Sequence, residues 1–423
     1  MSQPLPPEPE EPLLKLEPEQ GSPPGRRLHP PAMVNEVLEY LRCHSLAGKT
    51  ASDDGVGEDE KSGVQPDAVF LDATLGTAGH TLAILEAHPT CRVVAFDRDS
   101  ESMEFARSRL EAANVADRVT LVQGNFRNAV ELLQPFFDNL KVGADGRPIN
   151  RIDGALIDAG MSLYQVTWPE RGFSFRGNGP LDMRYGRHSE ESISAFDLVN
   201  RLSASELEDL LFKFSDERWA RRIATVIADH RRSHVIHTTD ELASLVEAAI
   251  PVGVRRQSRV HPATKTFAAL RLAVNDEFWS LDQGAWALSE VLAPAARLVI
   301  LTYSSHEDRT VKRTFRRLAG RSAGEAGNSN SHRTHRKRKQ AVLSPGHHAS
   351  GTTRSPLTFS LALPTDEQSE RATPPAAGFG QTWGMKIVTH KPLVPTPQEI
   401  AANPLARSCK LRAVEKFAIQ SRS

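Results

Sequence analysis

The sequence predicts an α/β protein with a doubly wound, mostly parallel, Rossmann-like sheet and a helical domain inserted into it. Short apolar segments alternate with helical segments over residues 68–157, a pattern typical of parallel strands joined by helical crossovers. A long stretch with helical periodicity follows, and the apolar segment 297–303 then resumes the strand pattern. The 423 residues leave room for two or three domains of roughly 150 residues each.

Charge and cysteine content exclude several classes of protein. Lys plus Arg and Asp plus Glu total 52 each, so the chain is not uniformly basic, and a nucleic-acid partner would need a local basic patch. Cys43, Cys91 and Cys409 include no Cys-x-x-Cys pair, which argues against a disulfide framework or a structural zinc site. No signal peptide, transit peptide or membrane-spanning apolar run is recognisable. We therefore expect a cytoplasmic protein, with a mitochondrial location as the alternative.

The N-terminal region is predicted to contain little regular structure. Residues 1–31 hold ten prolines and five glutamates, a composition that buries too little apolar surface to offset chain entropy, so we expect a disordered tail. Residues 33–41 have helical apolar spacing and predict one helix. Residues 44–66 are polar and rich in Gly, Asp and Ser, and we expect them to be flexible.

The ligand-binding core is predicted to begin in residues 32–160. Its predicted strands are 68–71, 92–96, 119–122 and 154–157, and the helices between them are 81–87, 100–113 and 127–140. Short apolar runs separated by helices of this length favour a parallel sheet with right-handed crossovers.

A helical domain is predicted to interrupt the sheet after its fourth strand. A Gly/Pro-rich loop extends to about residue 186, after which helical periodicity dominates. The predicted helices include 203–214, 217–231 and 239–249. We place this substrate-recognition insertion at residues 161–258, and we expect residues 259–423 to supply the rest of the α/β core that begins in residues 32–160. Within the latter, the basic low-complexity segment 321–355 is expected to be disordered.

The glycine turn after the first predicted strand indicates a ligand site. In open α/β sheets, ligands bind at the carboxyl ends of the strands, where such a turn meets a helix. Gly76 and Gly79 let the backbone approach a ligand, and Asp97 at the next strand end can accept hydrogen bonds from both ribose hydroxyls. The turn lacks the full Gly-x-Gly-x-x-Gly of dinucleotide sites, which favours S-adenosylmethionine. An ordinary strand-to-helix turn is the alternative.

Several motifs in a fixed order point to one family. They are His29–Leu38, the turn ending in Gly79-His80, Glu170–Phe175, Gly179–Arg184, His261–Arg271 with Val274–Glu277, and Asn403–Arg412. Over nearly all of residues 28–416 the chain resembles the RsmH (MraW) family of bacterial 16S rRNA cytosine-N4 methyltransferases and their organellar relatives. The resemblance implies methyl transfer from S-adenosylmethionine to the exocyclic N4 of a cytidine, with small-subunit rRNA or a ribosomal particle as the partner.

The resemblance also assigns residues to the cofactor site. It implies contacts from Ala78, Gly79 and His80 at the turn, from Asp97 at the ribose, from Phe126 after the third strand, and from Asp158 and Gln165 beyond the fourth. The residues alone indicate only the turn and Asp97. A core aromatic is the alternative for Phe126, and a solvated strand end is the alternative for Asp158.

Catalysis at cytosine N4 requires hydrogen-bond acceptors beside the cofactor. The amine is a poor nucleophile because its lone pair is delocalised, so the enzyme must align it and accept its hydrogen bonds as positive charge develops. Asp158 and Asp182, the latter in the Gly-Pro-Leu-Asp-Met-Arg loop, are the candidates. For Asp182 the alternative is an ion pair with Arg184 or Arg171.

Basic residues around the insertion are candidates for RNA contact. Arg255, Arg256 and Arg259 lie just beyond its predicted helices, and contacts of arginine with phosphate supply much of the affinity for RNA. The alternative for each of them alone is an arginine on a solvent-exposed helix face with no role in RNA binding.

Departures from the family pattern leave a second function class open. Ala78 replaces a glycine and adds a methyl expected close to the cofactor, and residues 159, 161, 163 and 164 differ from the family segment Leu-Gly-Val-Ser-Ser-Pro-Gln. The family signature Ser-Phe-His-Ser-Leu-Glu-Asp-Arg reads Thr-Tyr-Ser-Ser-His-Glu-Asp-Arg over 302–309, so Ser304 stands at the histidine position. A noncatalytic RNA-binding or ribosome-assembly protein with this fold is the alternative, but the retained cofactor residues favour an enzyme. The missing third glycine disfavours a dinucleotide oxidoreductase.

Overall fold

The structure is a computed structural model that describes seven stretches of the chain. They are residues 30–43, 68–139, 151–166, 168–186, 192–258, 260–320 and 383–418. The predictions for the tail 1–31, except its last two residues, and for the segments 44–66 and 321–355 lie outside the described residues. Arg259 lies outside them as well.

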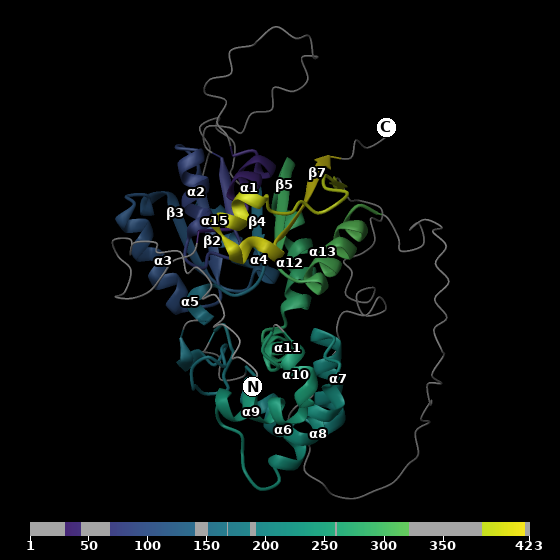
Figure 1. Cartoon of the computed structure of the whole chain (residues 1–423). Coiled ribbons are helices and arrows are strands. Elements are labelled where there is room, and N and C mark those ends of the chain that lie inside the picture. The colour runs from purple at the N-terminus through teal and green to yellow at the C-terminus, as the bar shows by residue number, and fades with distance from the viewer. Residues whose placement is uncertain are drawn as a thin grey trace, which may run out of the picture.

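The described strands form one mixed sheet in the order β3-β2-β1-β4-β5-β7-β6 (Figure 1). The strands are β1 (Val69–Asp72), β2 (Arg92–Asp97), β3 (Val119–Gln123), β4 (Ile152–Asp158), β5 (Leu292–Thr302), β6 (Trp383–Ile387) and β7 (Lys410–Ala418). β1 to β5 pair in parallel, whereas β7 is antiparallel to both β5 and β6. The predicted doubly wound, mostly parallel sheet is confirmed. Its strand order reverses between β1 and β4, the position where such sheets bind ligands.

Helices cover both faces of the sheet. Successive side chains of a strand point to opposite faces, so Phe70 of β1 packs in one apolar cluster and its neighbours Val69 and Leu71 pack in the other. The Phe70 face is covered by α1 (Val34–Leu41), α2 (Gly79–Ala87) and α3 (Ser100–Ala112). The opposite face is covered by α4 (Ala129–Asn139), α12 (Glu277–Val291) and α13 (Ser305–Leu318).

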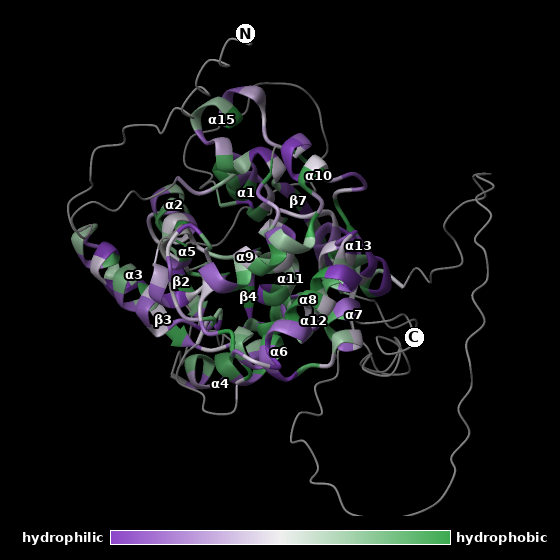
Figure 2. Cartoon of the chain, turned by 60° about the horizontal axis from the view of Figure 1, so that its bottom comes forward, coloured by the Kyte–Doolittle hydropathy of each residue, from purple (hydrophilic) through white to green (hydrophobic). Residues whose placement is uncertain are grey.

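Helices between β4 and β5 build a further hydrophobic core and lie below the sheet in Figure 1. The helices that supply most of its buried apolar side chains are α6 (Ala195–Arg201), α7 (Ala204–Ser215), α8 (Ala220–His230), α9 (Thr239–Ala249) and α11 (Thr264–Val274). Two short helices, α5 (Leu163–Val166) and α10 (Val252–Gln257), lie in the same part of the chain. Apolar residues are concentrated on α11, in the middle of this group (Figure 2). The buried cluster runs from Phe173 to Phe278. It therefore continues past the predicted domain boundary at 258, because α11 packs against α7.

Two loop motifs between β4 and α6 pack backbone against backbone. Gly172 has φ +71°, and a Cβ atom there would overlap the carbonyl oxygen of Pro180. A Cβ atom at Gly179 would likewise overlap the carbonyl oxygen of Pro169. Both glycines are needed because the loops approach each other this closely, and their contact fixes the loop that carries Arg171.

The described helices are not wholly apolar. None of them is long and apolar enough to cross a membrane. Within the described residues there is also no group of three or more His, Cys, Asp or Glu side chains that could hold a metal ion.

Candidate cofactor and substrate site

A cavity of about 530 Å³ lies at the carboxyl edge of the sheet, where the sheet meets the helical core. Its walls come from the turn after β1, the ends of β2 and β4, the junction of α11 and α12, and the segment after α15 (Pro397–Ala402). The cavity brings together six residues predicted for the cofactor site: Gly79, His80, Asp97, Phe126, Asp158 and Gln165. The other described residues predicted for a site, which are Ala78, Asp182, Arg255 and Arg256, are not among those that line it.

The turn after β1 brings main-chain atoms to the cavity. Gly76 has φ +50°, in the left-handed region that favours glycine, and its N–H donates to Asp97 Oδ2 at 2.9 Å. Ala78 is also left-handed, with φ +63°, and is fully buried in the core below the turn. The backbone conformation therefore accounts for the family glycine at this position. The Ala78 methyl group, expected beside the cofactor, packs in the core instead.

Asp97 ends β2 with both carboxylate oxygens oriented by the main chain. Oδ2 accepts from Gly76, and Oδ1 accepts from the N–H of Asp99 at 2.9 Å. Burial raises the pKa of Asp97 to about 6, although these main-chain hydrogen bonds favour the charged form. Each oxygen keeps acceptor capacity toward the cavity, so the carboxylate can receive the two hydroxyls of a ribose as predicted from the sequence.

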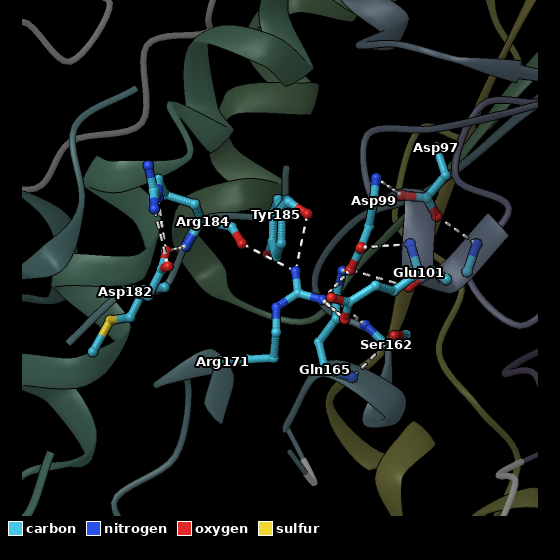
Figure 3. A network of polar contacts seen from close by, with 12 residues as sticks. Asp97, Asp99, Glu101, Ser162, Gln165, Arg171, Asp182, Arg184 and Tyr185 are labelled. Carbon is cyan, nitrogen blue, oxygen red and sulfur yellow. Dashed lines mark hydrogen bonds and ion pairs between the residues drawn. The ribbon is translucent and has the colours of Figure 1, made fainter. Parts of the chain in front are cut away.

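A buried polar network supports this edge of the cavity (Figure 3). Asp99 Oδ2 accepts from Gln165 Nε2 at 3.0 Å and pairs with Arg171 Nη1 at 2.8 Å. Arg171, whose side chain is 1% exposed, also donates to the carbonyl oxygens of Arg184 and Tyr185 at 3.1 and 3.0 Å. Gln165 thus lines the cavity while its amide orients Asp99. These contacts join the loop after β4 to the segment that follows β2. Removing one partner of the buried pair would leave the other as an uncompensated buried charge.

Asp158 ends β4 and has two side-chain partners. Its Oδ1 accepts from the hydroxyl of Tyr303 at 2.8 Å, and its Oδ2 lies 3.5 Å from Nδ1 of His80. Burial raises the pKa of Asp158, while His80 and the Tyr303 hydrogen bond act in the opposite direction. His80 Nε2 lies 3.0 Å from the carbonyl oxygen of Ala32, which can only accept. Nε2 therefore carries a proton, and the ring is fixed with Nδ1 toward Asp158.

Phe126 begins the 3₁₀ turn after β3 and forms an apolar wall of the cavity. Its ring packs against Gly284 in α12, where a Cβ atom would overlap the ring. The small residue in the helix therefore sets the position of the aromatic side chain. A flat apolar surface on the β3 side of Asp97 suits an adenine ring.

The remaining predicted residues lie elsewhere. Asp182 Oδ1 accepts from Arg184 Nε at 2.8 Å and its Oδ2 accepts from Arg184 Nη2 at 3.1 Å, so the ion pair given as the alternative is present. Asp182 lines a separate open groove. Arg255 on α10 lies 3.8 Å from Glu247, and Arg256 is exposed.

A sequence comparison decides the family. The model of the MraW methylase family matches residues 26–344 of the chain. The chain belongs to this family. A relative from Geobacter sulfurreducens named ribosomal RNA small subunit methyltransferase H is 36% identical over 390 residues, which are 92% of this chain and 99% of the relative. A Heliobacterium modesticaldum relative of the same name is 33% identical over 390 residues, which are 92% and 98% of the two chains. One from Methylobacterium nodulans is 35% identical over 396 residues, 94% of this chain and 91% of the relative.

A polar cluster at the junction of α11 and α12 also lines the cavity, and no site role was predicted for its residues from the sequence. Arg271 Nε and Nη2 donate to the two carboxylate oxygens of Glu277 at 2.8 and 3.1 Å, and the Tyr185 hydroxyl donates to Glu277 Oε1 at 3.0 Å. Glu307 lies 3.9 Å from Arg271 Nη2. Arg271 and Glu277 fall within family motifs, but no local pattern indicated that α11 and α12 deliver them to the cavity.

S-adenosylmethionine is the cofactor of this MraW methylase, and the cavity contains a group that suits its amino-acid end. Asn403, 5% exposed, lines the cavity, and its Nδ2 donates to the carbonyl oxygen of Pro30 at 3.0 Å. Its Oδ1 is buried without a hydrogen-bond partner among the described residues. A buried acceptor of this kind needs a donor, and the α-ammonium group of the cofactor is one. Asn403 Oδ1 and the Asp97 carboxylate thus give the cavity hydrogen-bond acceptors for the amino-acid end and the ribose of the cofactor.

Proposed function

We propose that this protein transfers a methyl group from S-adenosylmethionine to the exocyclic N4 of a cytidine in small-subunit rRNA. The observation that carries the proposal is Asp158, a carboxylate in the wall of the cofactor cavity that accepts a hydrogen bond from Tyr303 and lies 3.5 Å from His80 Nδ1. The relatives named as small-subunit rRNA methyltransferases give the class of substrate. Small-subunit rRNA within a ribosomal particle is the proposed partner, in the cytoplasm or, alternatively, in mitochondria.

The order of residues along the sheet edge supports this chemistry. Asp97 ends β2 and Asp158 ends β4, with β1 between these two strands. Neighbouring strands lie about 4.8 Å apart, so the two strand ends are separated by roughly 10 Å. Asp97 would hold the ribose of the cofactor and Asn403 its α-ammonium group, and Asp158 lines the same cavity.

Asp158 is proposed to act on the amine of the target cytosine. Bound S-adenosylmethionine supplies an electrophilic methyl group on a sulfonium. The protein must hold the amine in line with that methyl and accept its hydrogen bonds as positive charge develops on nitrogen. Tyr303 holds the carboxylate of Asp158, and burial, which raises the pKa of Asp158, makes it a better proton acceptor than an exposed aspartate. The proposal no longer includes Asp182, because its carboxylate is paired with Arg184 outside the cavity.

Two of the departures from the family pattern, Ala78 and Ser304, are compatible with catalysis. The Ala78 methyl packs in the core, and Ser304 caps α13: its hydroxyl accepts from the N–H of Glu307 at 3.2 Å. The Glu307 carboxylate in turn accepts from the N–H of Ser304 at 2.8 Å, which completes a capping box. Ser304 thus has a structural task of its own, and nothing at these positions favours a noncatalytic protein.

The decisive experiment follows methylation of rRNA directly. Nucleosides from the small-subunit rRNA of cells with and without the gene should differ by one N4-methylated cytidine in mass spectrometry. Purified protein with radiolabelled cofactor should methylate particles from the deleted strain, and Asp158→Asn should reduce kcat by about 100-fold or more while binding those particles normally. Identical nucleoside profiles in the two strains would refute the proposed function.

A further inference from the structure

The polar cluster at the junction of α11 and α12 lies beside Asp158 on the cavity wall. Tyr303 connects the two, because its hydroxyl donates to Asp158 at 2.8 Å and its N–H donates to Glu307 Oε2 at 2.9 Å. The other oxygen of Glu307 lies 3.9 Å from Arg271. Arg271, Glu307 and Asp158 therefore line one continuous part of the cavity, next to the carboxylate that faces the target amine.

Arg271 has hydrogen-bond donors that the protein does not use. Glu277 contacts one edge of the guanidinium through Nε and Nη2. No acceptor for Nη1 is found in the part of the chain that the structure describes, and the side chain, 17% exposed, lines the cavity. A guanidinium held on one edge presents the donors of its other edge in a fixed direction. The site is thus built to receive acceptor atoms of a ligand.

Hydrogen bonds join the end of α11, which carries Arg271, to the loop at Met183 and Tyr185. Asn275 Nδ2, one turn further along the chain, donates to the carbonyl oxygens of Met183 and Arg271 at 2.7 and 3.0 Å. Asn275 Oδ1 accepts from the N–H of Tyr185 at 2.9 Å, and the Tyr185 hydroxyl contacts Glu277. These contacts hold the guanidinium and its partner carboxylate before any ligand arrives, which is what a discriminating site requires.

We propose that Arg271 is the specificity-determining residue that binds the Watson–Crick edge of the target cytosine through its N3 and O2 acceptors. The inference rests on the proposed function, in which Asp158 accepts a hydrogen bond from N4 of the same base. Cytosine presents one donor and two acceptors along this edge, and the cavity wall presents a carboxylate followed by arginine donors. Uracil would direct O4 at Asp158 and N3–H at Arg271, so both contacts would be repulsive.

The test combines a protein change with a change in the base. Arg271→Lys keeps the positive charge but removes the forked pair of guanidinium donors. Small-subunit particles are reconstituted with either cytidine or 3-deazacytidine at the methylated position, and 3-deazacytidine lacks the N3 acceptor. Arg297→Lys is the matched control, because Arg297 also has a 17% exposed side chain and pairs with a carboxylate, Glu415, at 2.8 Å. Arg297 lies on β5 and is not among the residues that line the cavity. Cofactor affinity is measured by calorimetry for each protein.

We expect Arg271→Lys to bind S-adenosylmethionine within about twofold of the wild type and to lose roughly 10- to 100-fold in kcat/KM on cytidine particles. The 3-deazacytidine change should reduce kcat/KM by at least about tenfold for the wild type and Arg297→Lys, but by less than about threefold for Arg271→Lys. Comparing ratios between proteins cancels the different intrinsic reactivity of the two bases.

Two results would overturn the inference while leaving the proposed function intact. One is an equal penalty from 3-deazacytidine in the wild type and in Arg271→Lys. The other is a loss of cofactor affinity in Arg271→Lys that matches its loss of kcat/KM, which would make Arg271 a support of the cofactor site. Wild-type protein that binds the cofactor but methylates no cytidine in either particle would overturn both proposals.

Discussion

The hydroxyl of Tyr303 donates a hydrogen bond to Asp158 at 2.8 Å. The family signature has phenylalanine at this place, and the hydroxyl that this chain adds donates to Asp158 Oδ1. Burial raises the pKa of Asp158, whereas the hydrogen bond favours the ionised carboxylate and so lowers that pKa. Tyr303 therefore extends the pH range in which Asp158 is available as an acceptor.

Tyr303→Phe should shift the acid limb of the rate profile to higher pH. Without the hydroxyl the pKa of Asp158 rises, so the ionised form is lost earlier as the pH falls. We expect kcat on the acid limb to decrease about tenfold or more, with a smaller change on the alkaline side. The measurement is kcat against pH with saturating cofactor and particles. Tyr40→Phe on α1 is the control, and an acid limb at the same pH in all three proteins would contradict the prediction.

Three residues that line the cavity were predicted from the sequence, one by a local signal and two by the family resemblance. Asp97 follows from a strand end after a glycine turn, and Asp158 and Gln165 follow from the resemblance to a family. Asn403 and Arg271 could not be assigned, because their roles depend on contacts with segments far along the chain. The direction of the Ala78 methyl also depends on a backbone angle that the residue type does not encode.

At the scale of elements, α12 positions the aromatic wall of the cofactor site. Gly284 lies in the middle of this helix under the Phe126 ring. Gly284→Ala should displace that ring, lowering stability by about 1–3 kcal/mol and weakening cofactor binding by about tenfold. Gly253→Ala in α10 is the control, because nothing lies within 4 Å of its Cβ position. Thermal unfolding and calorimetry measure both effects, and equal cofactor affinity in the two variants would show that Phe126 does not depend on α12.

α10 presents the basic residues predicted for RNA contact. Arg256 is exposed, Arg255 is partly exposed, and Val252 and Val254 of the same helix are 51% and 42% exposed. Replacing Arg255, Arg256 and Arg259 by alanine should weaken particle binding and reduce the slope of log affinity against log salt by about one unit for each phosphate that the variant no longer neutralises. Binding titrations at several salt concentrations, with Arg201→Ala on α6 as control, measure this slope. An unchanged slope would place the RNA surface elsewhere.

The elements that were predicted are those whose burial is simple. β1 to β4 and the helices α1 to α4 and α7 to α9 agree with the predicted ranges to within a few residues, since most of them present apolar side chains to a core. β7 was not predicted because its charged residues are paired inside the fold. Arg412 donates to Asp308 at 2.6 Å, and Glu415 pairs with Arg42 and Arg297. Such a strand has the composition of a surface loop.

At the scale of the whole molecule, segments from opposite ends of the described chain close the cavity together. Asn403 donates to the carbonyl oxygen of Pro30, and the N–H of Met33 donates to Glu399 in α15. Pro30, Pro31 and Ala32 line the cavity, as do Asn403, Leu405 and Ala406. The cofactor site therefore depends on contacts across more than 360 residues of sequence.

Asn403→Ala should weaken S-adenosylmethionine binding by about tenfold, because a buried acceptor for the α-ammonium is removed. An analogue that lacks this amino group should bind the wild type and the variant with similar affinity, measured by calorimetry. Asn200→Ala is the control, since Asn200 also bonds main-chain groups, those of Phe196 and Ile236, but lies in the helical core. A tenfold loss for the analogue too would mean that Asn403 acts only by holding the wall.

The contact between the two end segments has a consequence for biosynthesis. While the ribosome is still translating the codons before Asn403, the emerging chain already contains the turn and Asp97 but lacks one wall of the pocket. A site that lacks this wall should hold the ligand less tightly, and a ligand stabilises a fold only as far as it binds it. Newly made chains should therefore become resistant to proteolysis in the presence of cofactor only after the segment that contains Asn403 has been synthesised and has packed against Pro30. Termination products that end before Asn403 should remain sensitive, so cofactor occupancy would distinguish chains that contain this segment from chains that lack it.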